Sequence, residues 1–194
     1  MIVLDRATLK DWGRLLVMRN DPDTVANSFS SKPVTVVEHM RWLRSVIDSE
    51  TLLFVARDTE RGVHVGTGRI DLVSPTPKVA KPARQKSESG RAVTLGTDAA
   101  PASAVAGSSY SEAQLSITVD SGQRGHGYGT EIVAALVKAV DGVGEYGGKT
   151  WEPLATKITA AVKPTNYASL RAFAACGFLP VKCEDDRIEL ELTR

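Results

Sequence analysis

A glycine-rich turn between two different hydrophobic patterns constrains this chain most. Apolar residues alternate at Leu115, Ile117 and Val119, which predicts a strand, and apolar residues recur at helical spacing over residues 132–140. Between them, residues 124–130 read Arg-Gly-His-Gly-Tyr-Gly-Thr. Glycine lets the backbone turn its N–H groups toward a ligand, and the positive end of the following helix attracts an anion. The sequence therefore predicts a strand, an anion-binding loop and a helix, with a phosphorylated ligand.

The spacing within this loop narrows the choice of ligand. It fits neither the dinucleotide pattern G-x-G-x-x-G nor the phosphate-loop pattern G-x-x-x-x-G-K-[ST]. Arg124, Gly127 and Gly129 match R-x-x-G-x-G, which resembles the acetyl-CoA pyrophosphate loop of the GNAT (Gcn5-related) N-acetyltransferases. A glycine-rich turn on its own is also common between the strands and helices of α/β folds.

A second pattern follows a strand predicted around residues 158–162. Residues 166–178 resemble the later GNAT motif N-x-x-[SA]-x-x-x-[YF]-x-x-x-G-F, whose defined positions hold Asn166, Ser169, Phe173, Gly177 and Phe178. Asn166 suits a helix N-cap, and Gly177 suits the left-handed position that follows a helix. The two motifs occur in the family's order, and the resemblance covers the chain apart from residues 74–112.

The resemblance implies an α/β GNAT fold. We expect a mixed, mostly antiparallel twisted sheet of about seven strands, splayed between the fourth and fifth strands and flanked by about four helices. The predicted strands cover residues 2–4, 52–57, 64–73, 113–119, 155–163, 179–184 and 187–193. The predicted helices cover residues 9–18, residues 35–47 after a Thr35 to Glu38 capping box, residues 127–141 and residues 166–176.

The length of the chain favours one domain. With 194 residues, 42% of them hydrophobic, residues 1–194 can bury one substantial core. Residues 74–112 are rich in Ser, Pro, Ala, Gly and Lys, which predicts a flexible insertion between the third and fourth strands. The basic residues of this segment fit a solvated surface; a docking role or a lid over the acceptor is the alternative.

Composition limits the classes of partner. The 24 Lys and Arg residues nearly balance the 23 Asp and Glu residues, so no nucleic-acid or anionic-membrane partner is expected. Cys176 and Cys183 have neither metal-ligand nor disulfide-framework spacing, so we expect no metal. Early charges at Asp5 and Arg6 and the absence of a long apolar run predict a soluble cytoplasmic protein. The sequence leaves open whether the chain forms a homodimer.

The resemblance implies acetyl-CoA as cofactor. Backbone groups of the fourth strand would pair with pantetheine, the loop amides would bind the pyrophosphate, and the later helix would bracket the pantetheine arm or its phosphate. The cofactor residues implied in this way are Ile117, Thr118, Val119, Arg124, Gly125, His126, Gly127, Gly129, Thr130, Asn166 and Ser169.

Acetyl transfer from a thioester needs a neutral amine and a proton for the departing thiolate. The tyrosine that commonly supplies this proton in the family falls at Phe173, which has none, so Ser116 or water is the predicted donor. The glutamate often found early in the fourth strand, where it acts as a base through water, falls at Gln114, which makes Gln114 a predicted catalytic residue together with Ser116 and Asp71. The remaining candidate bases are Asp71, Glu112 and His39.

The region that shapes the acceptor site is similar to that of GNAT enzymes acting on amino-sugar nucleotides, as in pseudaminic acid and related surface-glycan pathways. The similarity runs through R-N-D-P, S-F-S-S-x-P, E-H-x-x-W and G-x-x-R-x-D. Two arginines would hold the diphosphate, and amide and hydroxyl groups would bind the sugar. The predicted substrate residues are Arg19, Asn20, Ser28, His39 and Arg69.

Two other functions stay open from the sequence. Related GNAT branches acetylate protein N-termini or ribosomal proteins, although a peptide would favour an acidic groove and this region is rich in Arg and Lys. The second is a non-catalytic acetyl-CoA-binding module, which the departures at Phe173 and Gln114 would allow. In either enzymatic case the amine would attack the thioester directly in a ternary complex.

Overall fold

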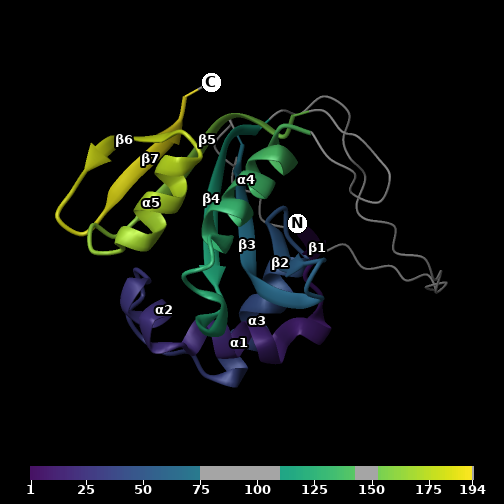
Figure 1. Cartoon of the computed structure of the whole chain (residues 1–194). Helices are drawn as coiled ribbons and strands as arrows, with labels where there is room; N and C mark the ends of the chain where they lie inside the picture. Colours follow the sequence, from purple (N-terminus) through teal and green to yellow (C-terminus); the bar gives the residue numbers. More distant parts are fainter. Residues whose placement is uncertain (75–109, 143–152, 194) are drawn as a thin grey trace, which may run out of the picture.

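The computed structural model describes residues 1–74, 110–142 and 153–193. Its strands form one seven-stranded sheet in the order β1-β2-β3-β4-β5-β7-β6 (Figure 1). Among the strands of the described residues, only β4 and β5 pair in parallel, and every other neighbouring pair is antiparallel. The predicted mixed sheet is therefore confirmed. The strands are β1 (Ile2–Arg6), β2 (Leu52–Asp58), β3 (Val63–Val73), β4 (Tyr110–Val119), β5 (Ala155–Val162), β6 (Phe178–Cys183) and β7 (Ile188–Leu192).

The described ranges contain five α-helices, one more than the sequence predicts. They are α1 (Trp12–Asn20), α2 (Pro22–Asn27), α3 (Val36–Ile47), α4 (Tyr128–Val140) and α5 (Tyr167–Ala175), with short 3-10 turns at Leu9–Asp11 and Ser121–Gln123. The additional helix is α2. The Asp21-Pro22 pair ends α1, but Asp21 also caps α2 and Pro22 occupies its first position, where proline is well tolerated. None of the described helices is long and apolar enough to cross a bilayer.

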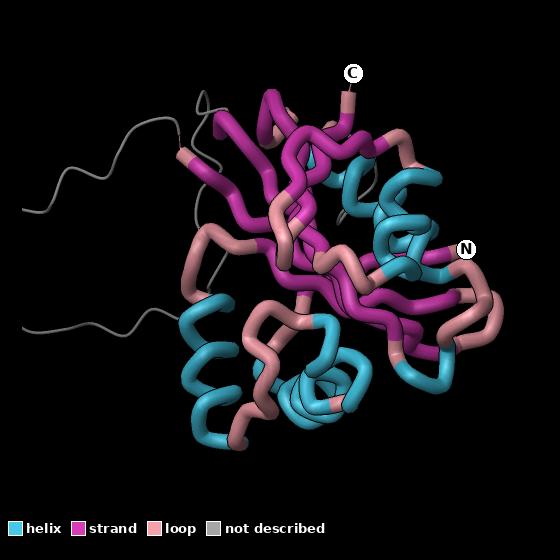
Figure 2. Tube along the Cα trace, turned by 90° about the vertical axis from the view of Figure 1, so that its left-hand side faces the viewer, coloured by secondary structure: helices cyan, strands magenta, loops and turns pink. Residues whose placement is uncertain are grey.

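Helices cover both faces of the sheet (Figure 2). On β2, Leu53 and Val55 pack in a small core with residues of α1 and α3, whereas Phe54 and Ala56 pack in the larger core with α4. Successive strand side chains point to opposite faces, so a single strand contributes to both cores. Four of the predicted substrate residues, Arg19, Asn20, Ser28 and His39, belong to α1, α3 and the segment between them.

The capping box predicted for α3 is confirmed. The Glu38 backbone N–H donates to the Thr35 hydroxyl at 3.2 Å, and the Thr35 N–H donates to the Glu38 carboxylate at 2.8 Å. The start predicted for the fourth strand is wrong, because β4 begins at Tyr110. The Tyr110 N–H donates to the Leu154 carbonyl at 2.9 Å and its side chain packs on the larger core, a long-range contact that local composition does not signal.

Most of the predicted insertion, residues 75–109, lies outside the described residues. The glycine-rich connection at residues 143–152 does so as well.

The sheet opens between β4 and β5. Pairing of β4 with β3 continues to Val119, opposite Gly66, but its pairing with β5 ends at Leu115, opposite Ala160. The β5-facing edge of residues 116–119 is therefore outside the ladder, which leaves backbone N–H and C=O groups for an extended ligand. The predicted splay is confirmed.

Candidate active site

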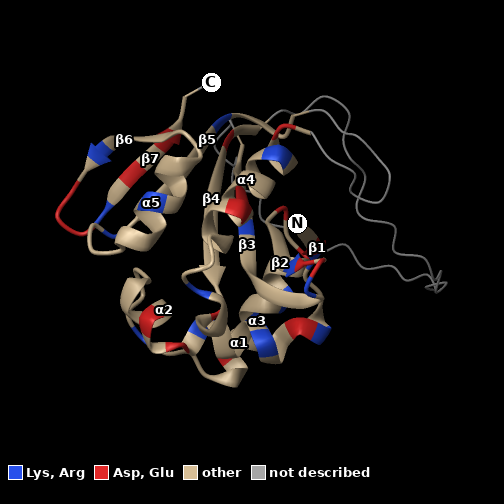
Figure 3. Cartoon of the chain, viewed as in Figure 1, with Lys and Arg blue, Asp and Glu red and all other residues tan. Residues whose placement is uncertain are grey.

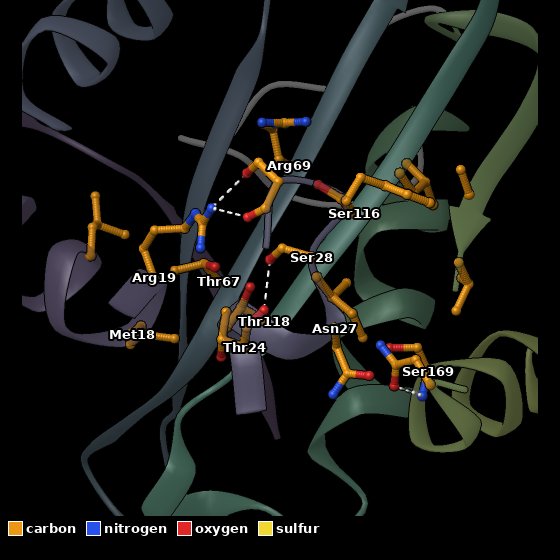
Figure 4. A pocket seen from close by; sticks show the side chains of 18 of the residues that line it. Met18, Arg19, Thr24, Asn27, Ser28, Thr67, Arg69, Ser116, Thr118 and Ser169 are labelled. Atoms are coloured by element: carbon orange, nitrogen blue, oxygen red, sulfur yellow. Dashed lines mark hydrogen bonds between the residues drawn. The ribbon is translucent and has the colours of Figure 1, made fainter. Parts of the chain in front are cut away.

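Two adjoining cavities lie at this opening. The loop cavity, about 630 Å³, is lined by residues of the 124–130 loop, and the helix cavity, about 660 Å³, is lined by residues of α1, α3 and β3. The close-up in Figure 4 shows Arg19, Arg69 and Ser116 around one part of the helix cavity, with Asn27 and Ser169 toward its other end. The residues that line both cavities are Thr24, Asn27, Ser28, Ile117, Thr118, Asn166 and Ser169.

The loop has the backbone geometry of an anion site. Gly125 and Gly127 have φ angles of +80° and +84°, in the left-handed region that favours glycine. Gly127 is also the N-cap of α4. The first N–H groups of a helix lack intrahelical acceptors and lie at the positive end of its dipole. A phosphate at this position would therefore meet several converging donors.

Nearly all predicted cofactor residues line the loop cavity, and His126 is the exception. It is exposed, and its Nδ1 lies 3.3 Å from the Gln123 carbonyl oxygen. The residues that do line the cavity are Ile117, Thr118, Val119, Arg124, Gly125, Gly127, Gly129, Thr130, Asn166 and Ser169.

Tyr128, which was not among the predicted site residues, holds the start of α4 in place through its side chain. Its side chain is buried, and its hydroxyl donates to the Asp58 carboxylate at 2.8 Å. Arg61 donates to the same hydroxyl at 3.0 Å. The Tyr128 hydrogen bond lowers the pKa of Asp58. The first residue of α4 is thus bonded to the end of β2, a contact between segments that no local pattern reveals.

The Arg124 side chain reaches away from the loop toward α2. Its guanidinium contacts the Asp23 carboxylate at 2.7 Å and also bonds to the Asp21 carboxylate. It donates to the Thr24 hydroxyl at 3.2 Å. The hydrogen bond from Arg124 lowers the pKa of Asp21. Its charge is therefore already paired, whereas the backbone N–H groups of this loop can bind an anion without breaking these contacts.

The later motif lies on the other side of the opening. The Asn166 side-chain oxygen accepts the Ser169 N–H at 3.2 Å, which is the predicted helix cap. Phe173 lines the helix cavity but is 2% exposed and packs edge-on against Phe178, with ring centroids 5.0 Å apart. Tyr167 is exposed and lines neither cavity. Neither aromatic side chain can therefore supply a proton here.

Among the predicted substrate residues, Arg19, Ser28, His39 and Arg69 line the helix cavity. Asn20 does not, because its side chain is used within the protein. Its amide nitrogen donates to the Val34 carbonyl and its oxygen accepts the Val34 N–H, both at 2.8 Å. The predicted sugar contact of Asn20 is thus replaced by a bond that fixes the chain before α3. The R-N-D-P pattern alone gives no indication that Asn20 bonds to the backbone of Val34.

His39 is almost fully buried, at 2% exposure. Burial, together with the positive charge of Arg19, lowers its pKa, while a hydrogen bond with the Trp12 backbone acts in the opposite direction. Its Nε2 has no hydrogen-bond partner in the described part of the chain. Neutral imidazole with one unused nitrogen can accept a hydrogen bond from a ligand.

The three predicted catalytic residues divide into two groups. Ser116 and Gln114 line the helix cavity. Asp71 lines neither cavity; its carboxylate contacts Arg69 at 2.8 Å and accepts from the Thr51 hydroxyl at 3.1 Å. Its geometry suits orientation of the Arg69 side chain. The alternative base Glu112 accepts from the Thr159 hydroxyl at 2.6 Å and is likewise outside both linings.

Comparison with known proteins identifies the family. A family model described as "Acetyltransferase (GNAT) domain" matches residues 2–179. No curated protein matches the sequence significantly.

Solved structures share the fold at low sequence identity. An aminoglycoside acetyltransferase, AAC(6')-Ib, in complex with coenzyme A and kanamycin is 18% identical with a TM-score of 0.67, covering 100% of this chain and 95% of that one. A ribosomal-protein-alanine N-acetyltransferase from Brucella melitensis is 18% identical with a TM-score of 0.61, covering 97% and 98%. An N-acetyltransferase from Staphylococcus aureus Mu50 is 17% identical with a TM-score of 0.62, covering 99% and 98%.

Proposed function

The chain belongs to the GNAT acetyltransferase family and is an acetyl-CoA-dependent N-acetyltransferase, and from this premise we propose that its acceptor is a primary amine on an amino sugar linked to a nucleotide. The observation that carries this proposal is the charge of the helix cavity. Among the described residues, its lining includes Arg19, Arg69 and Arg187 but only one carboxylate, Glu38. Glu38 stays ionised in the capping box of α3, where its hydrogen bonds with Thr35 lower its pKa. The lining therefore carries three positive charges against one negative charge, with Asp71 pairing with Arg69 from outside it, and this balance favours an anionic acceptor.

Unused donors support an anionic group at this position. Arg19 donates through one Nη to the Ser30 hydroxyl at 2.7 Å, while its other Nη is buried without a hydrogen-bond partner among the described residues. The Nε of Arg69 is likewise buried without a hydrogen-bond partner among the described residues. Buried guanidinium N–H groups that lack acceptors are costly, and phosphate oxygens would satisfy them.

Two aromatic side chains at the same cavity fit a nucleotide or sugar ring. Phe29 and Trp42 line it and are 47% and 36% exposed. An exposed aromatic face provides a stacking surface for a base or the apolar face of a sugar. An aminoglycoside such as kanamycin carries several positive charges, which three arginines would oppose.

The opening between β4 and β5 would direct the reaction. Exposed backbone groups of residues 116–119 pair with the pantetheine arm, the loop binds the pyrophosphate, and the thioester is then presented beside Ser116 and Gln114. The amine nitrogen forms a bond to the carbonyl carbon as the carbon–sulfur bond breaks. The nitrogen loses one proton and the thiolate gains one, and we assign the latter donation to Ser116 or to a water molecule beside it.

The proposal is tested by measuring thiol release from acetyl-CoA with a matched panel of amines. The panel contains an amino-sugar nucleotide, the same amino sugar without the nucleotide, an aminoglycoside and a peptide with a free N-terminus. We expect the highest kcat/KM for the nucleotide-linked sugar, and Arg69→Gln should reduce the preference for it over the free sugar. Equal rates for the two sugars would overturn the proposal, and preference for the peptide would favour protein acetylation. Binding of acetyl-CoA without thiol release on any amine of the panel would favour a non-catalytic module.

The role of Ser116 makes a separate prediction. If its hydroxyl donates the proton, Ser116→Ala should lower kcat by about 10²-fold, the usual size of general acid catalysis, while KM for acetyl-CoA changes little. Steady-state kinetics checks this. Ser111→Ala is the matched control, because Ser111 is on the same strand, outside both linings, with its hydroxyl donating to Val73 at 3.0 Å. An unchanged kcat in Ser116→Ala would assign the donation to water.

A further inference from the structure

The segment between α1 and α3 forms a wall common to both cavities. We call residues 21–34 the strap. Its members Thr24, Asn27 and Ser28 line the loop cavity and the helix cavity alike. In Figure 1, α2, the helical part of the strap, lies beside the ends of β4 and α5. The position of the strap therefore decides the shape of the acceptor side and of the passage between the two cavities.

The strap has no hydrophobic anchor of its own. None of residues 21–34 is buried, and α2 has six residues. A helix this short is marginal without tertiary contacts. The position of the strap must therefore depend on polar contacts with the rest of the protein.

Arg124 supplies such contacts from the acetyl-CoA loop. It bonds to both carboxylates at the start of the strap, Asp21 and Asp23, and donates to the Thr24 hydroxyl. Asp21 in turn accepts the Thr24 N–H at 3.0 Å as the cap of α2. Figure 3 shows acidic residues on and beside α2. The residue that opens the pyrophosphate loop thus also holds the first turn of the strap.

Other basic residues hold the rest of the strap. Lys163, which follows β5, donates to the Ala26 carbonyl at 2.9 Å and contacts the Ser31 hydroxyl at 3.0 Å. The Arg187 guanidinium lies 5.2 Å from the centre of the Phe29 ring. These contacts come from the far side of the opening, so Arg124 is distinctive in joining the strap to the loop that binds the cofactor.

We propose that Arg124 is a positioning residue that couples the two sites: by holding Asp21, Asp23 and Thr24, it transmits the ordering of the loop by acetyl-CoA to the strap and so to the acceptor cavity. Pyrophosphate binding fixes the backbone of residues 124–130, which restricts the Arg124 side chain and, through its two ion pairs, the strap. The acceptor then binds to a wall that is already ordered, which is positive coupling between ligands. The inference rests on the proposed function only for the identity of the acceptor.

Amide hydrogen exchange of the strap tests this coupling, with coenzyme A as the only ligand. In the unaltered protein, saturating coenzyme A should slow exchange in residues 22–34 by about fivefold or more, the lower end of typical coupling. In Arg124→Gln, exchange should be faster and insensitive to coenzyme A, although coenzyme A still binds. Asp21→Asn combined with Asp23→Asn should give the same result, because it removes the other half of the contact.

Arg171→Gln is the matched control. Arg171 also lines the loop cavity, but from α5, so its loss removes a positive charge without touching the strap. In Arg171→Gln, saturating coenzyme A should slow amide exchange in the strap as much as in the unaltered protein. In kinetics, Arg124→Gln should raise KM for the acceptor more than KM for acetyl-CoA.

Two results would overturn the proposal. One is protection of the strap in Arg124→Gln equal to that in the unaltered protein. The other is faster strap exchange on coenzyme A binding to the unaltered protein, which would mean that pyrophosphate draws Arg124 away from the two carboxylates. Because no acceptor is present in the exchange experiment, its outcome is independent of whether the nucleotide-sugar assignment holds.

Discussion

Single glycines act in two different ways in this molecule. At Gly125 and Gly127 an added Cβ would meet nothing within 4 Å, so the requirement for glycine there is the positive φ angle. At Gly66 and Gly68 the φ angle is ordinary and space is the limit. An added Cβ would lie 2.4 Å from the Thr118 carbonyl oxygen at Gly66 and 2.8 Å from the Leu136 side chain at Gly68.

The loop glycine leads to a prediction about affinity. Gly127→Val places a β-branched residue at a φ of +84°, which costs about 1–3 kcal/mol and should raise the acetyl-CoA dissociation constant by roughly 5- to 150-fold as the loop changes conformation. Isothermal titration calorimetry measures this. Gly13→Ala, in α1 where an added Cβ also meets nothing, should leave affinity intact. Unchanged affinity in Gly127→Val would exclude the loop as the pyrophosphate site.

Burial of His39 predicts a pH dependence of stability. Its pKa is lower in the folded protein than the usual 6.5, so the unfolded chain binds the proton more readily. Above pH 6.5 both states are neutral there; as pH falls below 6.5 toward the folded pKa, His39 should progressively reduce the free energy of unfolding. Urea denaturation as a function of pH should show a smaller loss in this window for His39→Gln. An identical slope in the variant would contradict the prediction.

Among the elements, β4 is the strand whose two edges serve different purposes. One edge pairs with β3 from Glu112 to Val119, whereas the other leaves β5 at Leu115 and becomes the open edge at the active site. Close packing of β3 keeps that edge in place, since Gly66 allows the Thr118 carbonyl and the Ile132 side chain to approach. The open edge of β4 at the active site therefore depends on how closely β3 packs against the other edge of β4.

This dependence predicts unequal effects of two similar substitutions. Gly66→Ala brings a methyl group against a backbone carbonyl that cannot move without disturbing the β3–β4 pairing, so we expect a loss of about 1–3 kcal/mol in unfolding free energy and weaker acetyl-CoA binding. Gly68→Ala meets the ends of the Leu136 side chain, which can shift, and should cost less. Urea denaturation and calorimetry compare the two. Equal losses would contradict the importance of the Thr118 carbonyl.

For the whole molecule, one sheet carries a hydrophobic core on each face, and the acceptor cavity lies on the side of the smaller core. The larger core joins the sheet to α4 and α5, and the smaller joins β2 to α1 and α3. The helix cavity lies on the side of the smaller core, and its wall includes the strap, which contributes no buried residue. The strap can therefore vary with little loss of the main core, whereas Leu115, Val162 and Phe173 belong both to the cavity lining and to the larger core.

The pairing of β3 with β4 predicts that residues 75–109 can be shortened. Val73 lies opposite Glu112, so the ends of this segment are neighbours that a short turn could join. Each doubling of loop length costs only roughly 0.6 kcal/mol, so a shorter connection should leave thermal stability unchanged or slightly higher. Thermal denaturation of the shortened protein checks this. A large decrease in Tm would show that the segment contributes to folding, contrary to its composition.

The sequence by itself determined the features that depend on nearby residues. Apart from α2, the order of strands and helices follows from spacing and residue type over a few positions, as do the Thr35 capping box, the Asn166 cap and the glycine conformations of the loop. Local backbone preferences and hydrophobic periodicity are expressed within one or two turns, so they can be read before the chain is folded. The two motifs built from these residues resemble those of the GNAT family, and that resemblance implied the overall fold and the donor.

Only the tertiary structure decided how polar side chains pair across the molecule. Asn20 is bonded to Val34, Asp71 faces Arg69, and Arg124 contacts Asp23 from 101 positions away in the chain. Each of these residues had several chemically suitable partners in the sequence, and hydrogen bonds and ion pairs carry no periodicity that would select one. The packing of α1, α2 and the loop against the sheet makes that selection, and with it the shape and charge of the acceptor site.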